Sequence, residues 1–251
     1  MTFMLKIKDI EIGEGRPKIC LPITGKDLTE IEQQSRVIND KQADLVEWRV
    51  DFYQDHDIQS ALEIIREQIG ERPLIFTFRT IREGGQKDIT DQEYLSLNEK
   101  AMMSGLIDLV DIELKLQAVI RNPLIAKAKQ QGVATIISNH DFEKTPAKEE
   151  MINRLKEAEL VGASIAKLAV TPNSSTDVLS LLTVTNKMKD IIKIPLVTMS
   201  MGGLGMVSRL AGEVFGSSIT FGTAGKISAP GQIEQATLST VLDVIHENIT
   251  K

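Results

Sequence analysis

The sequence predicts an α/β fold: a (β/α)8, or TIM, barrel with a short N-terminal β-hairpin that closes the bottom of the barrel. Three observations indicate this fold. Eight short β-prone runs recur along the 251 residues, the intervals between them have room for a helix and two loops, and no proline- or serine-rich linker divides the chain. We therefore expect a single barrel domain over residues 1–251, with the hairpin in residues 1–16.

The predicted elements follow from the periodicity of apolar residues. The eight predicted strands cover residues 18–24, 44–51, 73–80, 106–114, 133–140, 164–170, 195–201 and 217–222. Helical periodicity is clearest in residues 28–41, 148–161, 176–191 and 233–249. Before the first strand the chain alternates in polarity and then turns at glycines, which predicts the hairpin. An open doubly wound sheet is the alternative fold, but it does not account for eight evenly spaced strand–helix units.

The composition is typical of a soluble globular protein, with 42% hydrophobic and 25% charged residues. A net charge of -6 argues against a nucleic-acid partner. No apolar run is long enough to cross a bilayer, and the charged N-terminal stretch lacks a signal-peptide core. The one cysteine, Cys20, excludes an internal disulfide, and its predicted strand favours a buried, inert thiol over a nucleophile. We expect a cytoplasmic protein without a membrane partner.

Lys167 lies in the middle of "GASIAKLAV" (162–170), an apolar, β-prone run with no acidic residue. Burying an ammonium group costs several kcal/mol unless the group is paired or loses its proton. One interpretation is a lysine that pairs with a buried acid or extends to the barrel rim. The other is a nucleophile, because desolvation and nearby cations lower the pKa of a buried lysine and its free amine attacks ketones to form a Schiff base.

Other polar residues gather where the predicted strands end, which is where barrels of this kind place their chemistry. His140 ends the fifth strand, next to the strand of Lys167, and suits a proton shuttle. Glu83 follows the third strand and either orients His140 or balances Arg82 at the surface. Further candidates are Glu47, Arg49, Arg79, Arg209, Ser228 and Gln232. The arginines among these candidates either bind a ligand or form structural ion pairs. No grouping has metal-ligand spacing, so we expect no metal.

Six motifs, in order along the chain, resemble those of type I 3-dehydroquinate dehydratases, the Schiff-base enzymes of the shikimate pathway. They are "EWRVD" (47–51), "FTFRTIREGG" (76–85), "SNHDF" (138–142), "AKLAV" (166–170), "SRLAGEVFGS" (208–217) and "SAPGQ" (228–232). The resemblance implies Lys167 as nucleophile, His140 as acid and base, and Glu83 as the partner of His140. It implies substrate binding by Glu47, Arg49, Arg79, Arg209, Ser228 and Gln232, and a homodimer without a cofactor.

The function implied is the dehydration of 3-dehydroquinate to 3-dehydroshikimate, in aromatic amino acid biosynthesis. Trp48 lies inside the first motif, but by alternation it points away from Glu47 and Arg49, so we expect it to pack. Pro22 stands where some members of that family have serine, which removes any hydroxyl contact from the first strand. Two alternatives remain: a Schiff-base (class I) aldolase on the same barrel, and a non-catalytic barrel that binds a small carboxylate.

Overall fold

The computed structural model describes residues 4–41, 43–225 and 228–249, and its main sheet is a barrel of parallel strands. In spatial order β10-β3-β4-β5-β6-β7-β8-β9, each strand pairs in parallel with its neighbour. Their bounds are β3 Lys18–Ile23, β4 Leu45–Arg49, β5 Leu74–Thr77, β6 Leu109–Glu113, β7 Ala134–Asp141, β8 Ile165–Val170, β9 Leu196–Ser200 and β10 Ile219–Phe221. The (β/α)8 prediction is therefore confirmed.

The barrel closes between β9 and the chain that leads into β10. A parallel bridge joins Leu196 to Ser217, and the Ser218 amide donates to the Leu196 carbonyl at 2.7 Å. The Ser217 hydroxyl accepts from the Thr198 amide at 3.0 Å. The short strand β10 thus completes the ring together with the residues before it.

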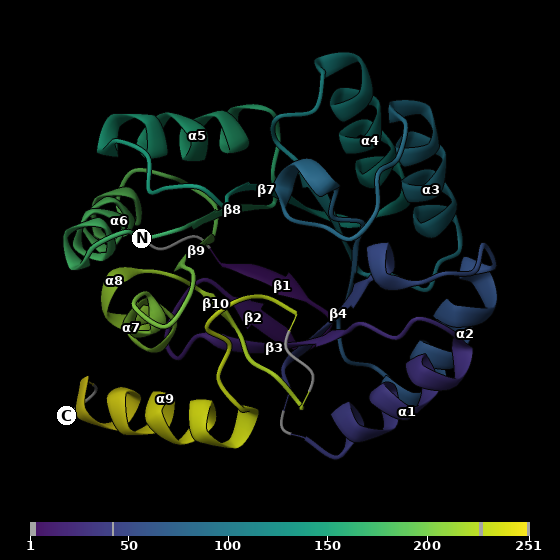
Figure 1. Cartoon of the computed structure of the whole chain (residues 1–251), viewed down its shortest axis with the longest axis horizontal. Coiled ribbons are helices and arrows are strands. Elements are labelled where there is room, and N and C mark those ends of the chain that lie inside the picture. Colours follow the sequence, from purple (N-terminus) through teal and green to yellow (C-terminus); the bar gives the residue numbers. More distant parts are fainter. Residues whose placement is uncertain (1–3, 42, 226–227, 250–251) are drawn as a thin grey trace.

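Helices surround the strands (Figure 1). They are α1 Leu28–Asn39, α2 Ile58–Ile69, α3 Asp91–Met103, α4 Ala118–Gln131, α5 Lys148–Leu160, α6 Ser175–Met188, α7 Met206–Leu210, α8 Gly212–Phe215 and α9 Gln235–Ile249. Side chains fix several starts: Asp27 accepts the Glu30 amide before α1, and Thr90 and Ser174 form capping boxes before α3 and α6. No helix in the described residues is long and apolar enough to span a membrane.

The hairpin consists of β1 (Leu5–Ile7) and β2 (Ile10–Ile12), which pair antiparallel. Ile12 is fully buried in an apolar cluster with residues near the N-terminal ends of the barrel strands, among them Cys20, Leu45 and Ile75. The hairpin therefore covers the bottom of the barrel, as predicted. Residues 1–3 of the predicted hairpin lie outside the described residues.

Alternation along the strands sends side chains to two apolar layers. On β8, Ile165 and Ala169 belong to the cluster inside the barrel, whereas Ala166, Leu168 and Val170 belong to the cluster between strands and helices. Lys167 shares its face with Ile165 and Ala169 and so points into the barrel. The same pattern on β4 turns the indole of Trp48 outward. There it packs edge-on against Tyr53 and Phe76, with ring centroids 5.6 Å apart in each pair.

Candidate active site

A pocket of about 210 Å³ opens at the C-terminal ends of the barrel strands. All nine predicted site residues line it: Glu47, Arg49, Arg79, Glu83, His140, Lys167, Arg209, Ser228 and Gln232. Apolar side chains complete the wall, notably Met199, Met201 and Phe221. The tertiary structure thus brings together residues that are spread over most of the sequence.

A second cavity of about 210 Å³ lies at the opposite end, between residues 13–15 and the starts of β9 and β10. Its charged lining residues are Glu14, Lys189, Asp190 and Glu213. Because the predicted nucleophile and proton shuttle both line the first pocket, we assign the chemistry to that pocket.

Lys167 is buried, and its ammonium group is paired. Its Nζ donates to Asp111 Oδ2 at 3.2 Å and lies 3.7 Å from Glu47 Oε1. The nitrogen also lies 4.5 Å from the centre of the Phe221 ring, within cation–π distance. Lys167 therefore pairs with a buried acid, as one interpretation of the sequence predicted, and its side chain also lies in the pocket wall.

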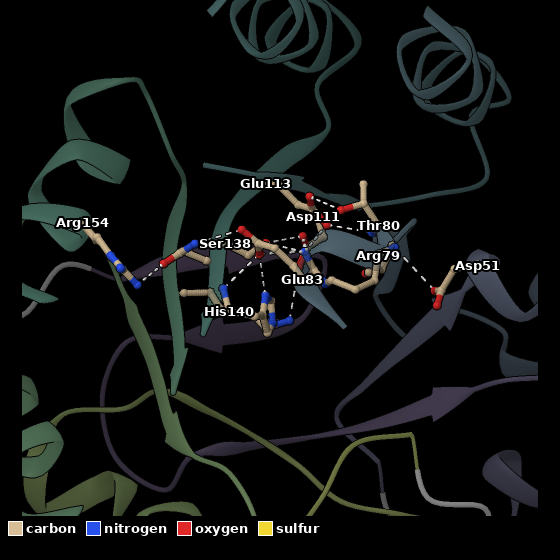
Figure 2. A network of polar contacts seen from close by, with 12 residues as sticks. Asp51, Arg79, Thr80, Glu83, Asp111, Glu113, Ser138, His140 and Arg154 are labelled. Carbon is tan, nitrogen blue, oxygen red and sulfur yellow. Dashed lines mark hydrogen bonds and ion pairs between the residues drawn. The ribbon is translucent and has the colours of Figure 1, made fainter. Parts of the chain in front are cut away.

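His140 and Glu83 form a pair at the pocket rim (Figure 2). His140 Nδ1 lies 3.0 Å from Glu83 Oε2, which also accepts from the His140 amide at 2.9 Å. Glu83 is only 3% exposed, and Arg82 pairs instead with Asp91. The alternative of a surface acid that balances Arg82 is therefore wrong.

The hydrogen bonds of Glu83 determine which ring nitrogen of His140 carries the proton. Arg154, on α5, donates to Asn139 Oδ1 at 2.8 Å, so the Asn139 amide nitrogen faces Glu83 Oε1 at 2.9 Å. Burial raises the pKa of Glu83 to about 7. Once ionised, Glu83 can only accept, so Nδ1 of His140 keeps the proton and Nε2 keeps a lone pair.

The electrostatics of the pocket favour a neutral imidazole. Burial, together with the positive charges of Arg79, Lys167 and Arg49, holds the pKa of His140 well below its ordinary value. A neutral histidine whose Nε2 is free is a ready proton acceptor near pH 7.

Arg79 is the centre of a buried ion-pair network that the sequence did not reveal. It lies two residues beyond β5, rather than in the strand as predicted. Its NH2 lies 2.8 Å from Asp111 Oδ1, and its NH1 donates to Glu113 Oε1 at 3.1 Å and to Ser138 Oγ at 3.0 Å (Figure 2). Arg79 thus forms structural ion pairs, one of the two roles the sequence left open, and its side chain also lines the pocket.

Arg49 also has a carboxylate partner. Its Nε and NH2 donate to the two oxygens of Asp51 at 2.8 Å each, which is a bidentate pair. Asp51 accepts the Gln86 amide as well, at 3.1 Å, so it ties β4 to the segment after Glu83. Arg49 NH1 is directed toward the Ser228 carbonyl at 3.5 Å.

Arg209 differs from these arginines, because its guanidinium contacts no carboxylate among the described residues. NH2 donates to the Pro230 carbonyl at 3.0 Å, NH1 approaches Met199 Sδ at 3.6 Å, and the buried Nε has no partner in the described part of the chain. Burial lowers the pKa of Arg209 to about 10, which leaves it charged at neutral pH. An unpaired guanidinium in a pocket can bind an anion without breaking an existing ion pair.

The segment after β10 covers one side of the pocket. Gln232 and Ser228 bond to each other: Gln232 Nε2 donates to Ser228 Oγ at 2.9 Å, and the Ser228 amide donates to Gln232 Oε1 at 2.8 Å. The Pro230 carbonyl also accepts the Gly202 amide at 3.2 Å, which docks the segment onto the loop after β9. Residues 226–227, directly before Ser228, lie outside the described residues.

The whole chain is similar to one family of enzymes. The family model for type I 3-dehydroquinase matches residues 19–249. The 3-dehydroquinate dehydratase of Bacillus licheniformis is 46% identical over 254 residues, which cover 99% of this chain and 100% of the relative. The chain belongs to the type I 3-dehydroquinase family.

Solved structures of type I 3-dehydroquinases and their relatives agree in fold. The type I 3-dehydroquinate dehydratase from Clostridium difficile, solved with covalently modified comenic acid, has a TM-score of 0.96 and 43% identity, covering 99% of this chain and 100% of that chain. The 3-dehydroquinate dehydratase from Geobacillus kaustophilus has a TM-score of 0.95 and 39% identity, covering 98% and 99%. Membership makes the chain a carbon–oxygen lyase that acts as a 3-dehydroquinate dehydratase, as the sequence predicted.

The site of this type I 3-dehydroquinase contains residues that the sequence interpretation missed. Asp111 and Glu113, which hold Arg79, were not among the candidates. Asp51 lies in the motif "EWRVD", but its pairing with Arg49 was not predicted. A signal was present: Asp111 and Glu113 alternate within the apolar run "LVDIE" (109–113), just as Lys167 interrupts its own strand. Asn139 and Arg154 offered no such signal, because their role depends on how α5 packs beside β7.

Proposed function

We propose that the chain dehydrates 3-dehydroquinate to 3-dehydroshikimate through a Schiff base on Lys167, in the shikimate pathway that supplies aromatic amino acids. One observation carries the proposal: Lys167, His140 with its partner Glu83, and Arg209, which has no carboxylate partner among the described residues, line one pocket. The family match favours this dehydration over the class I aldolase alternative.

The substrate has groups that match the pocket. It carries a ketone, a tertiary hydroxyl beside a carboxylate, and two further hydroxyls. Arg209 is our choice for the carboxylate, since its fork lacks an acidic partner in the described residues. Glu47, Arg49 and Arg79 are our choice for the ring hydroxyls, with Ser228 and Gln232 closing the pocket as a lid.

In the proposed reaction the neutral amine of Lys167 adds to the ketone carbon. The neutral adduct takes up one proton from the solvent and loses water to give an iminium ion, and the later hydrolysis of the product iminium returns that proton. The iminium acidifies the neighbouring C–H bond, whose proton passes to Nε2 of His140 while its electron pair forms an enamine. The enamine pushes out the β-hydroxyl, which leaves as water with the proton from His140. Water then hydrolyses the product iminium and frees Lys167. The covalently modified ligand in the Clostridium difficile relative supports a covalent step.

The test is intact-mass and peptide analysis after borohydride treatment with 3-dehydroquinate. Wild-type protein should gain one reduced ligand on Lys167, and Lys167→Ala should gain none and lose dehydration while staying folded. His140→Ala keeps the nucleophile but not the base, so a trappable adduct should accumulate while turnover falls by about 10⁴ or more. An adduct on a different lysine would refute the assignment.

Some expectations stay predictions. Among the described residues no cluster of three or more His, Cys, Asp or Glu side chains could hold a metal ion, and we predict that chelation with EDTA leaves activity unchanged. We likewise propose a cytoplasmic location and a homodimer. Light scattering on the purified protein checks the dimer.

A further inference from the structure

We infer that Asp111 is a positioning residue that acts through Lys167. Its carboxylate directs the ε-nitrogen into the pocket and is the fixed counter-ion of that nitrogen, both as ammonium and as iminium. This inference rests on the proposed Schiff base at Lys167.

The geometry singles out Asp111 among the groups around Lys167 Nζ. Asp111 on β6 is fully buried and makes the closest carboxylate contact to Nζ, at 3.2 Å. Glu47 on β4 is at 3.7 Å and also accepts the Thr77 hydroxyl at 2.9 Å. The other groups that face Lys167 are the Phe221 ring on β10 and the titratable side chains of Cys20 on β3 and His140 on β7.

Asp111 is itself held in place from two further sides. Arg79 NH2 lies 2.8 Å from its Oδ1, and the Ser138 hydroxyl donates to Oδ1 at 2.5 Å (Figure 2). Because Arg79 and Ser138 occupy Oδ1, Oδ2 is left for Lys167. A lysine side chain has many rotamers, so one fixed acceptor restricts where its nitrogen lies.

Asp111 acts as a fixed charge and not as a base. Burial alone would raise the pKa of Asp111, but Arg79, Lys167 and the Ser138 hydrogen bond outweigh that effect and hold it below the ordinary value. The carboxylate therefore stays ionised at neutral pH and leaves the proton transfers to His140 and water.

The charge on the reacting nitrogen explains the use of a fixed counter-ion. An ammonium ion and a ketone give an iminium ion and one water: the nitrogen bonds to carbon, the carbon–oxygen double bond breaks, and two of the three ammonium protons leave with the oxygen. The nitrogen carries one positive charge before and after this change. A carboxylate beside the nitrogen stabilises the ammonium ion before the step and the iminium ion after it. It therefore does not stabilise the unreacted enzyme, or its neutral amine, relative to the iminium.

Glu113 provides a matched control. It lies two residues along the same strand, is only 3% exposed and pairs with the same Arg79, but it makes no ion pair with Lys167. Removing its charge disturbs the Arg79 network without removing the partner of Lys167. Any effect specific to Lys167 therefore separates Asp111→Asn from Glu113→Gln.

The test is the pH dependence of Lys167 acetylation by trace acetic anhydride, read by mass spectrometry of its peptide. Only the neutral amine reacts. Loss of an opposite charge this close should move the labelling midpoint to lower pH by about one to three units in Asp111→Asn. In Glu113→Gln it should stay within about half a unit of wild type. The amount of borohydride-trapped adduct with 3-dehydroquinate should fall by about tenfold or more in Asp111→Asn, because the ε-nitrogen is then no longer held in position to attack the ketone.

A wild-type midpoint in Asp111→Asn, or an equal shift in Glu113→Gln, would overturn the inference while leaving the Schiff base intact. Wild-type protein that forms its adduct elsewhere would instead overturn the proposed function. In Asp111→Asn the amide nitrogen, itself a donor, faces other donors, which can disturb folding. Asp111→Ala, which leaves room for a water molecule, is therefore the second variant. Circular dichroism shows whether each variant folds. A folded variant must show the same shift of the acetylation midpoint to lower pH if the inference is correct.

Discussion

Charged residues in this pocket are stabilised by opposite charges at hydrogen-bonding distance. Lys167 pairs with Asp111, Arg49 with Asp51, and Arg79 with Asp111 and Glu113. Removing one partner of such a buried pair leaves an uncompensated charge, which typically costs about 3–5 kcal/mol. Arg209 is the exception in the described pocket, and it is therefore the residue that gains most from an anionic ligand.

Arg209→Lys should weaken substrate binding, because a point charge cannot replace two aligned hydrogen bonds. The loss of a charge-assisted hydrogen bond in a closed site is about 1.5–3 kcal/mol, or a ten- to hundredfold rise in KM. Steady-state kinetics with 3-dehydroquinate measures it. Arg121→Lys is the control, since Arg121 lies on α4 away from the pocket and also has a buried Nε without a partner in the described residues. An unchanged KM in Arg209→Lys would remove it from the carboxylate site.

Glu83→Gln should flatten the pH dependence of stability. Burial raises the pKa of Glu83 to about 7 from an ordinary value of 4.5, so the folded state binds a proton more tightly than the unfolded state. The contribution of this group is full below pH 4.5 and is lost as the pH rises to about 7. Urea unfolding of wild type should therefore show a steeper fall in unfolding free energy over this window than Glu83→Gln. Parallel curves would contradict the raised pKa.

At the scale of elements, strand alternation and one short turn place the catalytic groups. Leu109, Asp111 and Glu113 share the inner face of β6, as Ile136, Ser138 and His140 do on β7. Glu83 comes from the 3-10 turn η2 (Ile81–Glu83), which Glu113 fixes by accepting the Thr80 amide and hydroxyl, each at 2.8 Å. The acid that orients His140 thus depends on a turn anchored to β6.

Gly85→Ala should displace this turn. A Cβ atom at Gly85 would lie 1.9 Å from the Arg79 carbonyl oxygen, a contact that only backbone movement relieves. We expect kcat to fall by about tenfold or more as Glu83 leaves His140, and stability to fall by about 1–3 kcal/mol. Gly203→Ala is the control, because a Cβ there meets nothing within 4 Å. Equal kcat values in the two variants would show that the turn does not set the position of Glu83.

At the scale of the whole molecule, the two ends of the barrel have different tasks. The hairpin packs on the strand starts in an apolar cluster that extends to Met199, Met201 and Phe221 in the pocket wall, whereas the charged groups of the pocket lie at the strand ends. In this fold, one end of the barrel usually serves stability and the other end carries the chemistry. Changes at the hairpin should therefore alter stability without altering catalysis.

Ile12→Ala should lower the unfolding free energy by about 2–5 kcal/mol, because Ile12 is fully buried between the hairpin and the barrel. At a temperature where the variant is folded, KM and kcat should match wild type. Glu11→Ala, an exposed position on the same strand, should change stability by less than about 0.5 kcal/mol. A large loss of kcat in folded Ile12→Ala would show that the two ends are coupled.

The sequence by itself determined the number of barrel strands and that Trp48 points away from Glu47 and Arg49. These follow from local periodicity, which needs no knowledge of neighbours. By combining strand ends with family motifs, it also indicated nine of the residues that line the pocket. Element ends were less exact: the predicted strand 73–80 ends at Thr77 in β5, so Arg79 lies beyond it.

Only the tertiary structure decided which charges meet. Whether Lys167 pairs with an acid, and whether Arg79 holds a ligand or a carboxylate, depends on β6 lying between β5 and β7 with Asp111 on its inner face. The chain from Arg154 through Asn139 to Glu83 likewise joins a helix, a strand and a turn that are distant in sequence. Ion pairs and hydrogen bonds act over a few ångströms between groups brought together by packing, and the periodicity of one segment carries no information about them.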